Sequence, residues 1–126
     1  MANKKYKLLI AEDEISILEP YAEYFKMEGF EVETATDGAM ALEKAKSFDF
    51  DLMLLDIMMP KMDGLEVLKA MKADPKLKDK KVYLLTALGR DSVIKEGFEL
   101  GADGYLIKDQ ENPETVKKNV LKALEE

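Results

Sequence analysis

The chain contains no cysteine, no histidine and no tryptophan among its 126 residues. Without cysteine it can form neither disulfides nor thiolate sites for zinc or iron–sulfur clusters. Without histidine it lacks the commonest general base and the commonest metal ligand of proteins. Any chemistry must therefore depend on carboxylates, lysines and hydroxyl groups.

Long apolar runs are missing as well. No stretch approaches the roughly 20 apolar residues of a membrane span, and no apolar segment follows Lys4 and Lys5 as it would in a signal peptide. The net charge of -7 disfavours contact with a nucleic-acid backbone. We therefore expect a cytoplasmic protein that binds neither nucleic acid nor membrane, with residues 1–126 forming one domain.

Apolar runs alternate with segments of helical periodicity along the whole chain. The pattern predicts strands over Lys5–Ala11, Glu31–Thr34, Leu52–Asp56, Lys81–Thr86 and Gly104–Ile107. It predicts helices over Ile15–Met27, Gly38–Ser47, Gly64–Ala73, Asp91–Leu100 and Pro113–Leu124. The second strand alternates polar and apolar residues and is expected at a sheet edge, whereas the other four are nearly continuously apolar, as in strands covered on both faces.

Several residues mark where the helices begin and end. Asn112 and Pro113 form a start signal, and Gly29 and Gly101 lie where two helices should stop. Pro20 is anomalous because it falls inside the first predicted helix and removes one backbone hydrogen bond. The pattern allows either a kink there or, since Ser16 and Glu19 resemble a capping box, a late start just before Pro20.

Five successive strand–helix units predict an α/β three-layer sandwich. The expected fold is flavodoxin-like and doubly wound, with a five-stranded parallel sheet in the order 2-1-3-4-5 and five helices. Ligands bind such sheets beyond the carboxyl ends of the strands, where the strand order reverses. Glu12 and Asp13 follow the first strand and Asp56 ends the third, so these carboxylates should share one acidic pocket suited to a hard divalent cation.

The ordered set of motifs closely resembles the receiver domain of two-component response regulators. The resemblance covers nearly the whole chain and includes Glu12-Asp13, the run Leu-Leu-Asp-Ile-Met-Met-Pro-Lys-Met-Asp-Gly at 54–64, Leu85-Thr86-Ala87, and Gly-Ala-Asp-Gly-Tyr-Leu-Ile-Lys at 101–108. Each residue alone has a simpler structural explanation, such as a helix-start acid or a β-branched strand residue. Together, at successive strand ends, they are much harder to explain by coincidence.

The resemblance implies a phosphoacceptor site. Asp56 would be the nucleophile that takes a phosphoryl group from the phosphohistidine of a histidine kinase or histidine phosphotransfer protein. Mg²⁺ would be held by Asp13, Asp56 and the backbone carbonyl of Met58, with Glu12 acting through water. Lys108 and the hydroxyl of Thr86 would contact phosphoryl oxygens.

The same resemblance implies a signalling switch rather than an enzyme. Its only expected activities are Mg²⁺-dependent self-phosphorylation and autodephosphorylation. Thr86 would move toward the phosphoryl group and Tyr105 would turn inward, which would remodel the face of the fourth helix, fifth strand and fifth helix for a downstream protein. The alternative for Tyr105 is a half-buried strand aromatic with its hydroxyl at the surface. A monomer or a weak phosphorylation-dependent dimer is expected, either as a stand-alone receiver or as part of a larger regulator.

Four residues depart from the usual pattern. Glu12 stands where many receivers have Asp, and Asp109 stands where they have proline, so either a trans bond with local rearrangement or a strained cis bond is expected after Lys108. Asp109 also adds negative charge near the pocket, which should weaken the approach of a phosphodonor. Met58 and Leu88 are apolar and cannot orient an attacking water, which predicts a long-lived phosphoryl group.

Three other functions compete with this interpretation. A haloacid-dehalogenase-type phosphatase needs an Asp where Met58 stands. A flavodoxin-like cofactor binder needs a phosphate-accepting loop after the first strand, where Glu12, Asp13 and Glu14 would repel phosphate. An interaction module that is never phosphorylated would not need Asp13, Asp56, Thr86 and Lys108 together.

Overall fold

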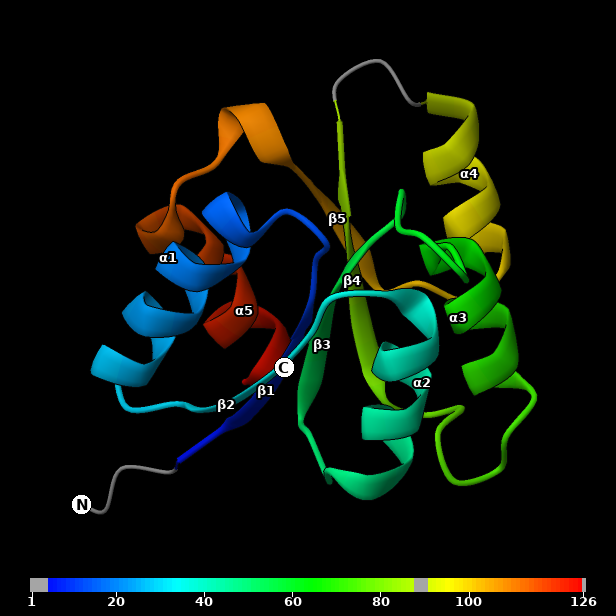
Figure 1. Cartoon of the computed structure of the whole chain (residues 1–126), viewed down its shortest axis with the longest axis horizontal. Coiled ribbons are helices and arrows are strands. Elements are labelled where there is room, and N and C mark those ends of the chain that lie inside the picture. Colours follow the sequence, from blue (N-terminus) through cyan, green and yellow to red (C-terminus); the bar gives the residue numbers. More distant parts are fainter. Residues whose placement is uncertain (1–4, 88–90, 126) are drawn as a thin grey trace.

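Five strands and five helices alternate in the computed structural model, which describes residues 5–87 and 91–125 (Figure 1). The strands are β1 (Lys7–Ala11), β2 (Glu31–Ala35), β3 (Leu52–Asp56), β4 (Lys81–Thr86) and β5 (Gly104–Ile107). The helices are α1 (Ile15–Met27), α2 (Gly38–Ser47), α3 (Gly64–Lys72), α4 (Asp91–Glu99) and α5 (Pro113–Leu124), with a 3₁₀ turn, η1 (Lys108–Gln110), between β5 and α5. Every predicted element is present within two residues of its predicted bounds.

The strands form one parallel sheet in the order β2-β1-β3-β4-β5, which confirms the predicted topology. The second strand lies at an edge, as its alternating sequence indicated. The expectation that the fifth strand is covered on both faces is wrong. β5 forms the opposite edge, and of its four residues only Leu106 is buried.

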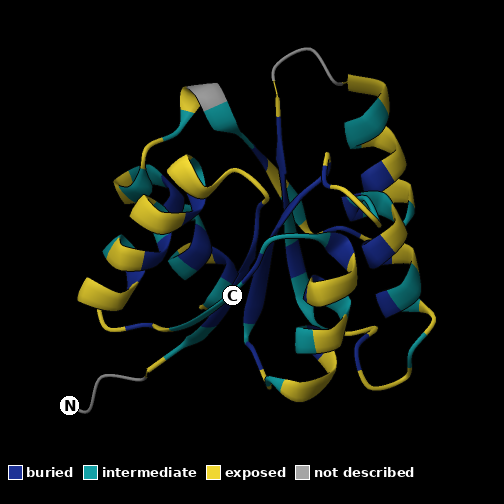
Figure 2. Ribbon diagram, viewed as in Figure 1, coloured by how far each residue is buried: buried dark blue, intermediate teal, exposed yellow. Residues whose placement is uncertain are grey.

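Side-chain alternation along the central strands creates two cores. Leu8 and Ile10 of β1 point to the layer formed by α1 and α5, while Leu9 and Ala11 point to the layer formed by α2, α3 and α4. β3 follows the same rule and is buried at all five positions. Figure 2 shows this buried sheet between two helical layers whose outer faces are exposed. Because helices cover both faces of the sheet, its central strands must be apolar at nearly every position.

Helix α1 begins at Ile15, as predicted, and carries Pro20 in its interior, so the late start that the pattern left open is excluded. The backbone amides of Ile17 and Leu18 both donate to the carbonyl of Glu14, which establishes the helix before the proline. The early start places Leu18 against the sheet, where it is 4% exposed. Burial of this side chain offsets the hydrogen bond that Pro20 removes.

The predicted helix boundaries depend on specific backbone conformations. Gly29 and Gly101 have φ angles of 94° and 106°, the left-handed conformation that ends a helix and favours glycine. The side chain of Asn112 accepts a hydrogen bond from the amide of Thr115, and Thr115 reciprocates, so Asn112 caps α5 as predicted. Within the described residues, every helix is too short or too polar to cross a membrane.

Candidate functional site

Three carboxylates meet at the carboxyl ends of the two central strands. Glu12 and Asp13 follow β1, Asp56 is the last residue of β3, and these strands pair directly. Each of the three side chains offers an oxygen, and these oxygens all lie within 4.8 Å of one another. Glu12 is fully buried and Asp56 is 1% exposed, whereas Asp13 is exposed. The sequence-based expectation of one shared acidic pocket is confirmed.

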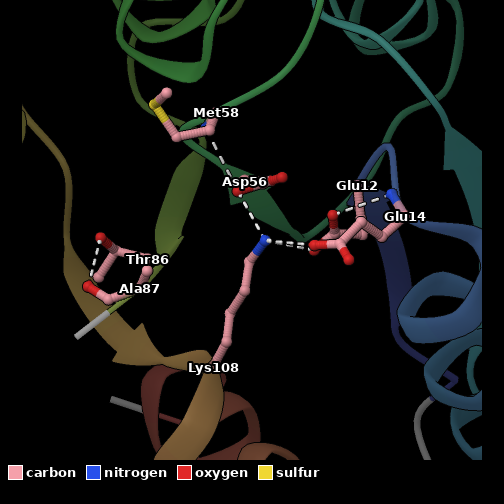
Figure 3. A network of polar contacts seen from close by, with 7 residues as sticks. All are labelled: Glu12, Glu14, Asp56, Met58, Thr86, Ala87 and Lys108. Atoms are coloured by element: carbon pink, nitrogen blue, oxygen red, sulfur yellow. Dashed lines mark hydrogen bonds and ion pairs between the residues drawn. The ribbon is translucent and has the colours of Figure 1, made fainter.

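Lys108 supplies positive charge to this pocket from the end of the edge strand β5. Its Nζ lies 2.9 Å from Glu12 Oε1, 2.9 Å from Asp56 Oδ1 and 4.0 Å from Glu14 Oε1 (Figure 3). Lys108 follows β5, which is separated from β3 by β4 and from β1 by both β3 and β4. Its long side chain therefore reaches across neighbouring strands, and only 16% of that side chain is exposed. The pairing with Glu12 was not expected from the sequence.

Backbone amides contact one oxygen of Glu12 and one oxygen of Asp56. The amide of Glu14 donates to Glu12 Oε2 over 3.1 Å, and the amide of Met58 donates to Asp56 Oδ1 over 3.3 Å. Asp56 Oδ2 is buried and has no hydrogen-bond partner among the described residues. A buried carboxylate oxygen without a partner is costly unless a ligand or cation occupies its free side.

The pKa values of Asp56 and Lys108 are both raised, as expected where buried carboxylates outnumber the positive charges. Burial and, to a smaller extent, the neighbouring carboxylate of Glu12 together raise the pKa of Asp56 from 3.8 to about 7, although Lys108 acts to lower it. Burial acts to lower the pKa of Lys108, but the carboxylates of Glu12 and Asp56 outweigh this effect and raise it. The raised pKa of Lys108 favours its charged form, whereas the raised pKa of Asp56 shows that one ammonium does not fully offset the burial of this carboxylate.

A cavity of about 800 Å³ opens over Asp56. One side contains Asp13, Asp56, Met58, Thr86 and Lys108, and the other contains the mainly apolar residues Ile17, Pro20, Tyr21 and Pro113 of α1 and α5. Sequence reasoning did not include this apolar side. The available signal was the i, i+4 spacing of Ile17 and Tyr21 on the predicted first helix, with Pro20 beside Tyr21.

Of the two residues predicted to relay a signal, Thr86 lines the cavity and Tyr105 does not. Thr86 is 1% exposed, and its hydroxyl donates to the carbonyl of Ala87 over 3.3 Å rather than to a site carboxylate. Tyr105 is 42% exposed and packs edge-to-face against Phe98 of α4 at a ring distance of 5.9 Å. Tyr105 therefore has the outward orientation in this structure.

The backbone after Lys108 adopts the first of the two predicted geometries. Cis peptide bonds are absent from residues 5–87 and 91–125, and the chain turns through η1 instead. The side chain of Asp109 and the whole of Leu88 lie outside the described residues. Met58 is described, and it is 59% exposed at the mouth of the cavity.

Fold and site together describe a doubly wound domain with an acidic pocket and a lysine counter-ion at the point where the strand order reverses. Residues 8–120 match the response regulator receiver domain family, and the chain belongs to it. Members of this family are signalling modules of two-component systems with a general phosphoacceptor role, rather than enzymes in the usual sense.

Individual relatives agree with this assignment. The chain is 40% identical to the transcriptional regulatory protein CpxR homolog of Haemophilus influenzae over 94% of this chain and 49% of that protein. It is 34% identical to the chemotaxis protein CheY of Treponema pallidum over 93% of this chain and 83% of that protein. The high-resolution structure of the chemotaxis response regulator CheY4 of Vibrio cholerae superposes with a TM-score of 0.87 at 36% identity, covering 94% of this chain and 98% of that one.

The chain spans about half the length of several of the curated relatives that it matches. The similarity to those relatives therefore concerns their receiver portion.

Proposed function

We propose that residues 1–126 act as one receiver domain in which Asp56 accepts a phosphoryl group from a phosphohistidine. The donor would be a histidine kinase or a histidine phosphotransfer protein. The observation that carries this proposal is the buried Asp56 carboxylate, which has one oxygen without a partner and faces a cavity beside Lys108.

In the proposed reaction, a carboxylate oxygen of Asp56 attacks phosphorus. The phosphorus–nitrogen bond breaks as the new phosphorus–oxygen bond forms, and the partner's imidazole leaves with the bonding electron pair. Lys108 already lies 2.9 Å from Asp56 Oδ1, so a small movement brings its ammonium to a phosphoryl oxygen. The hydroxyl of Thr86 would leave the carbonyl of Ala87 and donate to a second phosphoryl oxygen.

The residues of the pocket fit a magnesium ion. Its hard oxygen donors, their mutual spacing within 4.8 Å and the unpartnered Asp56 Oδ2 match what Mg²⁺ requires. Asp13, Asp56 and the backbone carbonyl of Met58 would hold the ion, with Glu12 acting through water. When bound, the ion offsets the negative charge that gathers between carboxylate and phosphoryl oxygens.

Phosphorylation would then change the surface formed by α4, β5 and α5. As Thr86 moves toward the phosphoryl group it vacates space, and Tyr105 would turn from its outward position into it, leaving Phe98. Such a two-state movement changes the face offered to a downstream protein. We further propose that the domain is cytoplasmic, is a monomer or a weak phosphorylation-dependent dimer, and acts through protein contacts.

Incubation with a small acyl phosphate and Mg²⁺, followed by intact-mass measurement, tests the proposal. Wild type and the control Asp79→Asn, which removes an exposed carboxylate far from the pocket, should gain one phosphoryl mass. Asp56→Asn should gain none, and omission of Mg²⁺ should suppress the adduct in wild type and in Asp79→Asn. An adduct that persists in Asp56→Asn would contradict the assignment of the acceptor.

A further inference from the structure

Sulfur chemistry in this chain is restricted to thioethers, because it has eight methionines and no cysteine. Methionine oxidation requires access of the oxidant to sulfur, so exposure decides which residues react first. Among the described methionines, Met53 and Met71 are fully buried and Met59 is 9% exposed. Met27 and Met58 are far more accessible, at 81% and 59%.

Met58 differs from Met27 in its position. Met58 lies two residues beyond Asp56, and its backbone amide donates to Asp56 Oδ1 over 3.3 Å. Its side chain lines the cavity over Asp56 and extends away from Lys108 in Figure 3. Met27, by contrast, is the last residue of α1, and it does not line that cavity. The two residues therefore form a matched pair, one at the pocket and one remote from it.

We infer that Met58 is an oxidation-sensitive site that sets the lifetime of the phosphoryl group on Asp56. The oxidant is a peroxide. The thioether sulfur attacks one peroxide oxygen, the oxygen–oxygen bond breaks, water leaves, and the sulfur loses two electrons to become a sulfoxide. Reduction by a thiol-dependent sulfoxide reductase reverses the step, so the modification can be transient.

The functional consequence follows from the change in polarity. The thioether of Met58 is apolar and a poor acceptor, so it would not orient a water that approaches phosphorylated Asp56. A sulfoxide oxygen accepts hydrogen bonds strongly, and the flexible side chain can place it over the cavity. A positioned acceptor or base typically contributes 100-fold to 10,000-fold to proton transfer. A neutral acceptor on a flexible arm contributes much less, so we expect hydrolysis to accelerate about threefold to tenfold.

The inference depends on the proposed phosphoacceptor role of Asp56, and the test keeps the two separate. Wild type, Met58→Leu and Met27→Leu are treated with limiting hydrogen peroxide, and sulfoxides are located by peptide mass spectrometry. Each sample is then phosphorylated with a small acyl phosphate and Mg²⁺, the donor is removed, and loss of the phosphoryl mass is followed over time. The ratio of oxidised to unoxidised lifetime is compared within each variant.

Wild type and Met27→Leu should both lose the phosphoryl group about threefold to tenfold faster after oxidation, and Met58→Leu should show a ratio near one. Met58→Gln, which carries a permanent amide acceptor, should shorten the lifetime without peroxide. A ratio near one in wild type, or oxidation of Met53 and Met71 before Met58, would overturn the inference. Failure of the unoxidised protein to form any adduct would instead refute the acceptor role of Asp56.

Discussion

Replacing Asp56 by asparagine should stabilise the protein at alkaline pH. The carboxylate is 1% exposed, one of its oxygens has no partner, and its pKa is raised by burial and by Glu12 to about 7 from 3.8. That difference corresponds to about 4 kcal/mol of folding free energy that the ionised carboxylate forfeits. Lys108 loses one partner in the variant but keeps Glu12 at 2.9 Å, and the new amide needs a partner of its own. A net gain of about 2–3 kcal/mol is therefore expected.

The sign of the pH dependence follows from proton binding. Because the pKa of Asp56 is higher in the folded state, that state holds more protons between about pH 4 and pH 7, and stability falls as pH rises through this window. The increase in unfolding free energy caused by Asp56→Asn should be within about 1 kcal/mol of zero near pH 4 and should reach its full value above about pH 8. Urea unfolding in the presence of a chelator, monitored by circular dichroism at each pH, measures the unfolding free energies of wild type and variant.

The exposed Asp79→Asn variant controls for the general loss of one negative charge and should change stability by less than about 0.5 kcal/mol at either pH. An equal effect of Asp56→Asn at acidic and alkaline pH would refute the reasoning. So would destabilisation at alkaline pH, since it would mean that the pair with Lys108 outweighs the burial of the charge.

Four further outcomes are expected. Met58→Asn combined with Leu88→Glu should accelerate loss of the phosphoryl mass from Asp56; an unchanged lifetime would show that these two positions do not govern hydrolysis. Tyr105 should become less exposed when a phosphoryl mimic such as beryllofluoride is added with Mg²⁺, as measured by solvent accessibility of its ring; if its exposure is the same with and without the mimic, Tyr105 is not part of the switch. Lys61 has a φ of 69°, so Lys61→Gly should raise the unfolding free energy by about 0.5–1 kcal/mol, whereas Lys69→Gly, at an exposed position of helix α3, should lower it by about 1 kcal/mol. A Cβ at Gly38 would collide with the backbone carbonyl of Met62, so Gly38→Ala should destabilise by about 3 kcal/mol in urea unfolding, while Gly29→Ala, which has open space but a φ of 94°, should cost about 1 kcal/mol.

Much of the fold could be predicted from residue patterns because the sheet is covered on both faces. Its central strands are therefore continuous apolar runs such as Leu52–Leu55, which are easy to recognise. The position of Asp13 and Asp56 at one pocket also follows directly, since the carboxyl ends of neighbouring parallel strands share an edge. The partial exposure of β5 could have been inferred from the predicted strand order, which already placed it at an edge.

Other features depended on three-dimensional context. The contact between Lys108 and Glu12 joins strands that are not neighbours, so no pairing rule predicts it. The start of α1 was ambiguous because the capping pattern at Ser16 competes with burial of Leu18, and only packing against the sheet shows which effect is larger. The outward position of Tyr105 on β5 likewise involves a contact with Phe98 on the preceding helix, α4.

The pairing of α1 with α5 constrains when the protein can fold. Glu28 and Lys117 form an ion pair across 89 positions of sequence, and the Lys117 ammonium lies 6.0 Å from the ring centre of Tyr24. Val116 and Val120 of α5, both fully buried, cover the same sheet face as α1. A ribosome-bound nascent chain without α5 would leave that face open to water or to chaperones. Native packing on this side should therefore be completed only after the last helix has emerged.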